Sequence, residues 1–206
     1  MQLSPVKIFL LKVLLWMPVC FAVWYYMRGV IGVPTWLGVK AIMTGLFPDI
    51  IRNVEFQGHL VNVVLRLTPE KLLGLEIPPG QVAEMVFSVN SLMYGYSIPL
   101  YTGLLLASPG TEREKWFRWI AGFAILVAVQ IWGVSFDILK TLLFNMDPAV
   151  SASLEFSPLQ KELTVLGYQF GYLILPAVSP LVIWIGFQRE FIAELSPGLS
   201  DRFPSP

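Results

Sequence analysis

Long apolar blocks constrain this chain more than any other feature of its sequence. Aliphatic and aromatic residues dominate four segments: 8–27, 92–108, 117–144 and 163–187. A helix of about 20 apolar residues crosses the hydrocarbon core of a bilayer. Only 14% of the 206 residues are charged, whereas soluble domains carry about 25%. The blocks therefore predict an α-helical polytopic membrane protein with about four transmembrane helices, forming a single membrane domain over residues 1–206.

The segment between the first two predicted spans, residues 33–90, has a different pattern. Residues 33–47 are apolar but contain Lys40, which favours an amphipathic helix at the membrane interface. Three further segments have the composition and alternation of strands: 54–57, 60–67 and 82–89. Gly58 and His59 form a tight turn between the first two strands. Because open sheet edges cannot face hydrocarbon, we expect a small three-stranded β-layer outside the bilayer, between spans one and two.

Positive charge in the short loops predicts an orientation. Lys7 precedes the first predicted span, Arg113 and Lys115 lie between the second and third, and Arg189 follows the fourth. Lysine and arginine collect in short cytoplasmic loops. We therefore expect cytoplasmic N- and C-termini and an extracytoplasmic β insert. The Pro- and Ser-rich end, residues 195–206, is expected to be a disordered tail.

Polar residues in the predicted spans mark a candidate site. Gln130 and Asp137 are seven residues apart and share a helix face, and Lys140 lies about one turn beyond Asp137. A charge in lipid costs several kcal/mol and normally faces the protein interior or a cavity. Polar groups of three spans fall at a similar depth, toward the extracytoplasmic side. We therefore predict one polar pocket beneath the β-layer, formed by Asn90, Ser91, Tyr94, Tyr96, Gln130, Asp137, Lys140, Gln169 and Tyr172.

Simpler interpretations of the same residues stay open. Asp137 and Lys140 also fit an interfacial pair that fixes the end of a helix. Gln130 and Gln169 also fit hydrogen bonds between packed helices. The spacing of Gly167 and Gly171 favours close helix packing, either within the chain or with the helix of a partner.

Several classes of function are disfavoured by composition. The 14 basic and 14 acidic residues balance, so no basic surface indicates a nucleic-acid partner. One cysteine, Cys20, and one histidine, His59, cannot form a disulfide or a Cys/His zinc cluster. No carboxylate cluster, phosphate-binding loop or dinucleotide fingerprint is present. We accordingly predict no catalytic residues, no metal and no cofactor.

Residues 89–185 resemble the exosortase/archaeosortase membrane proteins, which are thought to be transpeptidases that process C-terminal sorting signals. The resemblance places residues 89–96 where that family has its cysteine, but no cysteine is there. Gln130 to Gly133 stands at the N-x-x-R position, with Gly133 in place of arginine. Gln169 lies near the position of the histidine. Without a thiolate the acyl transfer has no route, so the resemblance implies a catalytically degenerate relative.

The chain is more closely similar to the exosortase H-associated membrane proteins. The stretches that carry this resemblance are 15–18, 47–49, 57–59, 90–96, 132–140 and 167–169. It implies a non-enzymatic accessory protein in the bacterial inner membrane, surrounded by lipid, which binds an exosortase or the C-terminal sorting helix of its substrate. Two alternatives remain: a membrane transpeptidase or hydrolase with a non-cysteine nucleophile such as Ser91, and a lipid-binding membrane protein.

Overall fold

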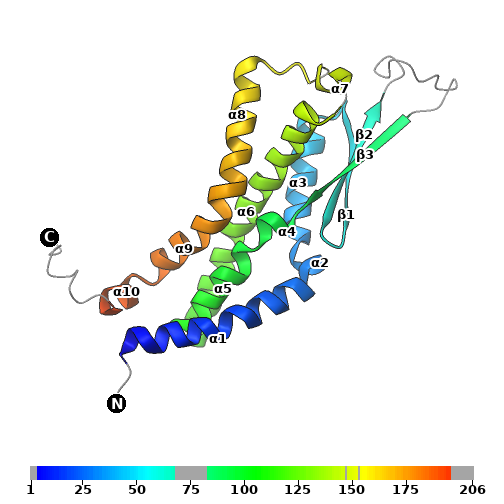
Figure 1. The fold of residues 1–206 in the computed structure, drawn as a ribbon. Helices are drawn as coiled ribbons and strands as arrows, with labels where there is room; N and C mark the ends of the chain where they lie inside the picture. The colour runs from blue at the N-terminus through cyan, green and yellow to red at the C-terminus, as the bar shows by residue number, and fades with distance from the viewer. Residues whose placement is uncertain (1–3, 68–82, 147, 153, 196–206) are drawn as a thin grey trace. The chain divides into compact units, whose positions relative to one another are not determined.

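The computed structural model describes residues 4–67, 83–146, 148–152 and 154–195 (Figure 1). All but the first residue of the predicted tail, 195–206, lies outside this described part. The chain divides into two compact units, which we describe separately. Unit 1 consists of residues 1–27, 96–126 and 177–206, and unit 2 of residues 28–95 and 127–176.

The described residues are mostly helical, and four stretches are long and apolar enough to cross a membrane. These stretches are Val6–Tyr26, Arg28–Leu46, Glu112–Phe144 and Pro158–Phe187. They contain α1 (Pro5–Tyr26), α2 (Arg28–Ile31), α3 (Val33–Leu46), α6 (Glu112–Phe144), α8 (Pro158–Gln169), the π-helical η2 (Phe170–Ile174) and α9 (Leu175–Phe187). The predicted class, a polytopic helical membrane protein, is therefore confirmed.

The lengths of two segments differ from the prediction. The segment interpreted as an interfacial helix, 33–47, belongs to a stretch that meets the length and hydropathy of a span. The helix continues through Lys40. The Lys40 ammonium lies 5.5 Å from the ring centroid of Trp36, one turn earlier, and this cation–π contact stabilises the charge on the helix surface. By contrast, Leu92–Ala107 is a shorter apolar segment. It consists of α4 (Leu92–Gly95) and α5 (Ser97–Ala107).

Unit 1 combines α1, α5, the first half of α6, α9 and α10 (Arg189–Leu195). The absence of a side chain at Gly103 lets α5 approach α1. A Cβ at this position would lie only 2.9 Å from the sulfur of Met17, which is too close. The hydroxyl of Tyr101 donates to the backbone oxygen of Arg118 at 2.7 Å. Close backbone approach and a buried hydrogen bond thus hold α1 and α6 against α5.

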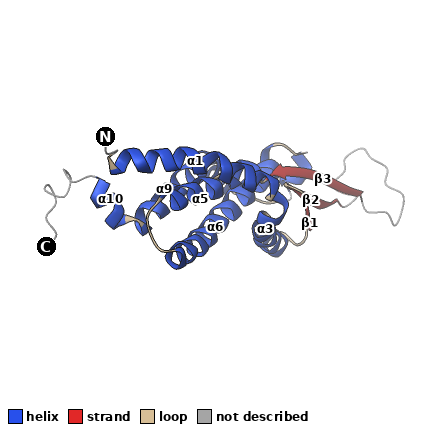
Figure 2. Cartoon of the chain, turned by 90° about the horizontal axis from the view of Figure 1, so that it is seen from below, coloured by secondary structure: helices blue, strands red, loops and turns tan. Residues whose placement is uncertain are grey.

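Unit 2 contains a three-stranded antiparallel sheet, as predicted, in the order β1-β2-β3. Its strands are β1 (Ile51–Gln57), β2 (Leu60–Leu67) and β3 (Ala83–Asn90). The β1–β2 turn contains Gly58 with φ of +67°, a value that suits glycine. One face of the sheet is buried and lies next to α3 (Figure 2). The indole of Trp36 on α3 donates to the backbone oxygen of Val54 at 2.9 Å.

The opposite face of the sheet is polar. Arg52 and Glu84 form an ion pair across the sheet. Ser88 donates to the side-chain oxygen of Asn62 at 2.7 Å. Polar side chains of this kind are stable only in contact with water or lipid headgroups.

The core of unit 2 fills the space between the sheet, α3 and the second half of α6. Val39 and Met43 of α3 are buried against Val134, Ile138 and Leu142 of α6. The short helix α7 (Pro148–Ala152) precedes α8, which runs alongside α6 (Figure 1). Ser157 caps the start of α8 with a reciprocal capping box to Gln160.

Candidate functional site

An ion pair framed by tyrosines lies on the second half of α6. The Lys140 ammonium is 3.5 Å from the Asp137 carboxylate, and these two side chains are only 25% and 17% exposed. The same ammonium lies 4.6 Å from the ring centroid of Tyr168. The Tyr94 phenol interacts with the Asp137 carboxylate. We call Tyr94, Asp137, Lys140, Tyr168 and Tyr172 the Asp137 cluster.

The rings of the Asp137 cluster connect three elements of unit 2. Tyr168 of α8 stacks on Tyr172 of η2 with centroids 5.7 Å apart. Tyr172 in turn meets Tyr94 of α4 edge to face at 6.1 Å. Tyr94 is 1% exposed. The cluster thus packs α4, α6 and the α8–η2 segment around one partly buried charge pair.

Gln130 forms a hydrogen bond with α3, as expected for an amide between packed helices. Its amide oxygen accepts a hydrogen bond from the Thr35 hydroxyl of α3 at 2.8 Å. Gln130 and Thr35 are 3% and 1% exposed, and the Gln130 amide nitrogen has no hydrogen-bond partner among the described residues. A polar contact between two apolar helices is typical of membrane helix packing.

Asn90 and Ser91 stabilise the junction between β3 and α4. The Asn90 side-chain oxygen accepts from the backbone N–H of Leu92 at 3.0 Å. The Ser91 hydroxyl and backbone N–H both donate to the backbone oxygen of His59, at 2.8 Å and 3.1 Å. These bonds attach the β1–β2 turn to the start of α4.

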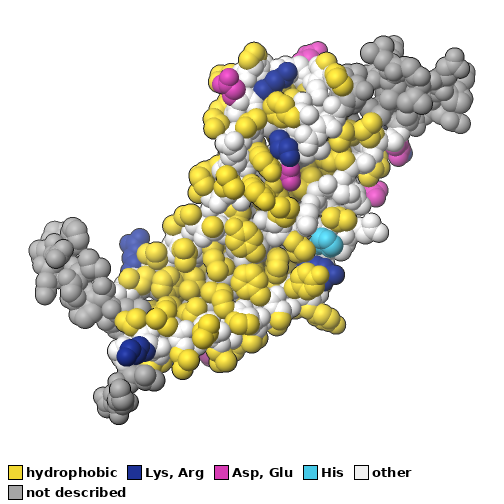
Figure 3. All heavy atoms as spheres, viewed as in Figure 1, with side chains coloured by type: hydrophobic (Ala, Val, Ile, Leu, Met, Phe, Trp, Pro, Cys, Tyr) yellow, Lys and Arg dark blue, Asp and Glu magenta, His cyan; other side chains and the backbone are white. Residues whose placement is uncertain are grey.

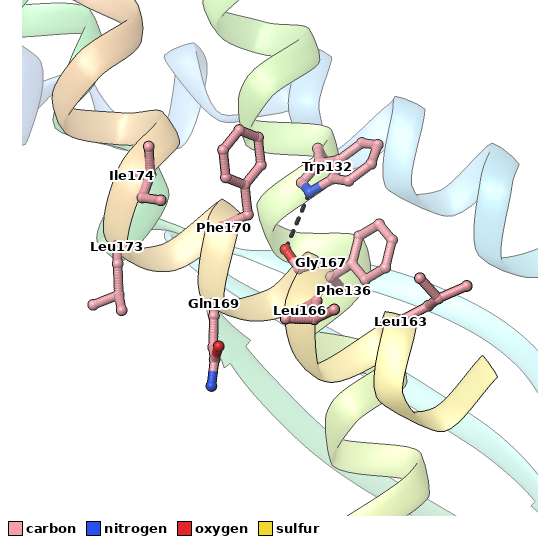
Figure 4. Close-up of a pocket in the computed structure, with 9 residues that line it drawn as sticks. All are labelled: Trp132, Phe136, Leu163, Leu166, Gly167, Gln169, Phe170, Leu173 and Ile174. Carbon is pink, nitrogen blue, oxygen red and sulfur yellow. Dashed lines mark hydrogen bonds between the residues drawn. The ribbon is translucent and has the colours of Figure 1, made fainter. Parts of the chain in front are cut away.

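The remaining two predicted residues lie elsewhere. Tyr96 belongs to unit 1, at the start of α5. Gln169 is exposed, and its side chain points away from Trp132 and Phe136 (Figure 4). The structure therefore brings together Tyr94, Asp137, Lys140 and Tyr172.

Two contributing residues were not in the predicted set. Tyr168 is four residues before Tyr172, a helical spacing that could have placed both on one face. Thr35 gave no comparable signal, because its segment was interpreted as an interfacial helix.

A groove on unit 2 lies between α6 and the α8–η2 segment (Figure 4). Its volume is about 670 Å³, and its lining is almost entirely apolar. The lining residues are Trp132, Phe136, Leu163, Leu166, Gly167, Gln169, Phe170, Leu173 and Ile174. Several of them are strongly exposed, Leu166 by 59% and Leu173 by 64%. Hydrophobic side chains cover much of the face that carries α6 and α8 (Figure 3).

Two glycines let the α8–η2 segment approach α6 closely, and one of them, Gly167, lines the groove. A Cβ at Gly167 would overlap the ring of Phe136, and a Cβ at Gly171 would lie 3.0 Å from the Cα of Gly133. The Trp132 indole donates to the backbone oxygen of Gly167 at 3.1 Å, as Figure 4 shows. The Gly167/Gly171 pattern therefore serves packing within the chain, and the apolar side chains around it form the open groove.

The site offers few groups for catalysis. Among the described residues, no three His, Cys, Asp or Glu side chains are placed to hold a metal ion. Ser91 already donates its hydroxyl hydrogen to the backbone of His59. Cys20 is buried in α1 of unit 1. The described arrangement is an apolar groove beside a partly buried ion pair.

Helices of span length with a partly buried polar cluster define a multi-pass membrane protein. The sequence model of the exosortase H-associated membrane proteins matches residues 3–191, nearly the whole chain, and the protein belongs to that family. No curated protein and no solved structure matches the chain.

Proposed function

We propose that the protein is a non-enzymatic accessory component of an exosortase system and binds a transmembrane helix of exosortase H in the α6/α8–η2 groove. The observation that carries the proposal is the groove itself, an apolar concave surface on a member of an exosortase-associated family. It lies within two stretches of span length, which favours an apolar membrane segment as its occupant.

The groove has the features of a helix-binding surface. Its walls carry large apolar side chains, Trp132 and Phe136 on α6 and Phe170 on η2. In lipid, helices associate through close van der Waals packing and a few hydrogen bonds, because the bilayer is as apolar as the side chains. Gln169 also lines the groove, but its amide points away from Trp132 and Phe136, so the groove offers the partner apolar contacts.

The Asp137 cluster has a supporting role in this proposal. Four of its residues lie on the same two segments that form the groove, and Tyr168 contacts Lys140 of α6 while it stacks on Tyr172 of η2. The predicted polar pocket is thus proposed to position the groove walls, while the apolar side chains of the groove contact the partner.

Tryptophan substitutions that fill the groove are expected to weaken the association. Exosortase H co-purified in mild detergent should fall about 10-fold or more in Leu166→Trp and Leu173→Trp, a loss of about 1.4 kcal/mol or more. The matched control is Leu159→Trp, since Leu159 is 64% exposed on the same helix but outside the groove.

The outcomes separate the possible occupants. Association that withstands both groove substitutions would overturn the groove as the exosortase site. Retention of the substrate's C-terminal sorting helix, with no retention of exosortase H, would assign the groove to the substrate.

We further propose that the protein lies in the inner membrane of a bacterium, with cytoplasmic termini and an extracytoplasmic sheet. This topology requires an odd number of crossings before the sheet, so only one of the stretches Val6–Tyr26 and Arg28–Leu46 crosses the bilayer, and the shorter Leu92–Ala107 segment crosses back. Supporting this, Arg113, Lys115 and Arg118 lie in or next to the short connection between α5 and α6. Alkaline phosphatase fused at either terminus should be inactive, and a fusion within the segment 68–82 should be active. The reverse pattern would invert the proposed topology.

A further inference from the structure

A second hollow, independent of the groove, lies in unit 1 where the α5–α6 connection meets the end of α9. Its volume is about 470 Å³. Its lining is mostly polar and includes Gly110, Glu114, Arg118, Gln188, Arg189 and Glu190. This composition differs from the apolar surfaces around it and indicates a site for a charged ligand.

Gln188 supplies an unused hydrogen-bond donor at this hollow. The residue is 4% exposed, and its amide nitrogen has no partner among the described residues. Leaving a buried donor without a partner costs about 1–3 kcal/mol. The amide nitrogen is itself enclosed, so a rotation of the side chain toward the hollow would let a ligand accept this hydrogen bond and remove that cost.

Two guanidinium groups add positive charge. The Arg118 side chain passes beside Gly110, whose Cβ position would lie 3.7 Å from Arg118 Nη1. The ion pairs of the described part of the chain, Arg52–Glu84 and Asp137–Lys140, include neither Arg118 nor Arg189. Arginine is well suited to phosphate, because its planar donors match the phosphate oxygens.

The two carboxylates at the hollow differ in their partners. The Glu114 carboxylate accepts a hydrogen bond from the backbone N–H of Thr111 at 3.2 Å. This bond caps the start of α6. Glu190 is exposed and takes part in neither ion pair described. The hollow therefore combines two arginines with two carboxylates, of which Glu114 is already bonded to the start of α6, and this mixed lining suits a ligand carrying both a phosphate and an ammonium.

The hollow lies at the ends of two helices of span length, and this place indicates its depth in the bilayer. The stretch of span length that contains α9 ends at Phe187, directly before Gln188, and α6 begins at Glu112. The ends of membrane spans lie at the level of the lipid headgroups. The walls are fixed there, because the Trp184 indole donates to the Ser108 hydroxyl at 2.8 Å and stacks on Phe9.

We propose that this hollow binds the headgroup of a phosphatidylethanolamine-type lipid. Arg118, Arg189 and the Gln188 amide receive the phosphate, and Glu190 receives the primary ammonium. An ammonium with N–H donors can hydrogen-bond to a carboxylate, whereas the quaternary ammonium of phosphatidylcholine cannot.

The test is lipid titration of the detergent-solubilised protein, read by native mass spectrometry. Dioleoyl phosphatidylethanolamine should bind about 10-fold more tightly than dioleoyl phosphatidylcholine, and Arg118→Gln with Arg189→Gln should abolish that preference. Arg113→Gln, a change on α6 outside the hollow, is the matched control and should leave the preference intact.

Further variants keep the proposal open to refutation. Gln188→Leu should weaken phosphatidylethanolamine binding while leaving the melting temperature unchanged or raised, since an unpaired buried donor is removed. Glu190→Gln should reduce the discrimination against phosphatidylcholine. Equal binding of both lipids to every variant would overturn the proposal. Equally tight binding of water-soluble glycerophosphoethanolamine would overturn the assignment to a lipid.

Discussion

Removing one charge of the Asp137–Lys140 pair is expected to destabilise the protein by on the order of 3 kcal/mol, and removing both charges to restore most of that loss. In Lys140→Met the Asp137 carboxylate, 17% exposed, keeps the Tyr94 phenol but loses its counter-charge. In Asp137→Leu the Lys140 ammonium keeps only the face of the Tyr168 ring. In the double variant neither charge is left unpaired.

The measurement is a double-mutant cycle. Thermal unfolding of each variant in detergent is monitored by tryptophan fluorescence, and the melting temperatures are compared. Lys161→Met is the control, because Lys161 is an exposed cation at the start of α8 and should shift stability by no more than about 0.5 kcal/mol. If the stability changes of the two single variants simply add up in the double variant, the two charges are not energetically coupled. The pair would then behave as a solvated interfacial pair.

Alanine at Gly133 is expected to destabilise the protein by about 1–3 kcal/mol and to distort the groove. The new Cβ would overlap the ring of Tyr94, which is 1% exposed and has no space to move. Gly171 also lies against Gly133, so a shift of the ring or of α6 would change the distance between α6 and η2. We therefore expect a lower melting temperature together with weaker exosortase co-purification.

Gly45→Ala provides the matched comparison on α3. A Cβ at Gly45 meets no atom within 4 Å. Alanine there should stabilise the helix by about 0.5–1 kcal/mol, because glycine loses more backbone entropy on folding. A melting temperature of Gly133→Ala equal to that of Gly45→Ala would show that Tyr94 does not require the close approach.

The sequence was most informative where periodicity was strong. The sheet followed from alternation around Gly58, and the long helices from continuous apolar blocks. The lengths of the helices were harder to predict. Lys40 suggested that the apolar segment 33–47 is interrupted, but the Lys40 ammonium lies over the Trp36 ring and the helix continues. The break between α4 and α5 was not predicted either, although Gly95 and Pro99 flank it and both residues interrupt helices.

The candidate site was only partly predictable for a related reason. Gln169 was placed in the pocket because it is polar, yet the adjacent Tyr168 faces Lys140 while Gln169 faces outward. Neighbouring helical positions differ by about 100° around the axis, so one residue changes the face. The π-helical turn at Phe170–Ile174 adds a further shift, and composition does not reveal it.

The polar outer face of the sheet has a consequence for how unit 2 sits in a bilayer. Sinking this unit deeper would carry Arg52, Glu84 and the open strand edges into hydrocarbon, at several kcal/mol for each charge. Raising it would expose the leucines of α8 to water. The two penalties oppose each other and set a fixed vertical level for unit 2, so a partner helix must present its complementary segment at that height.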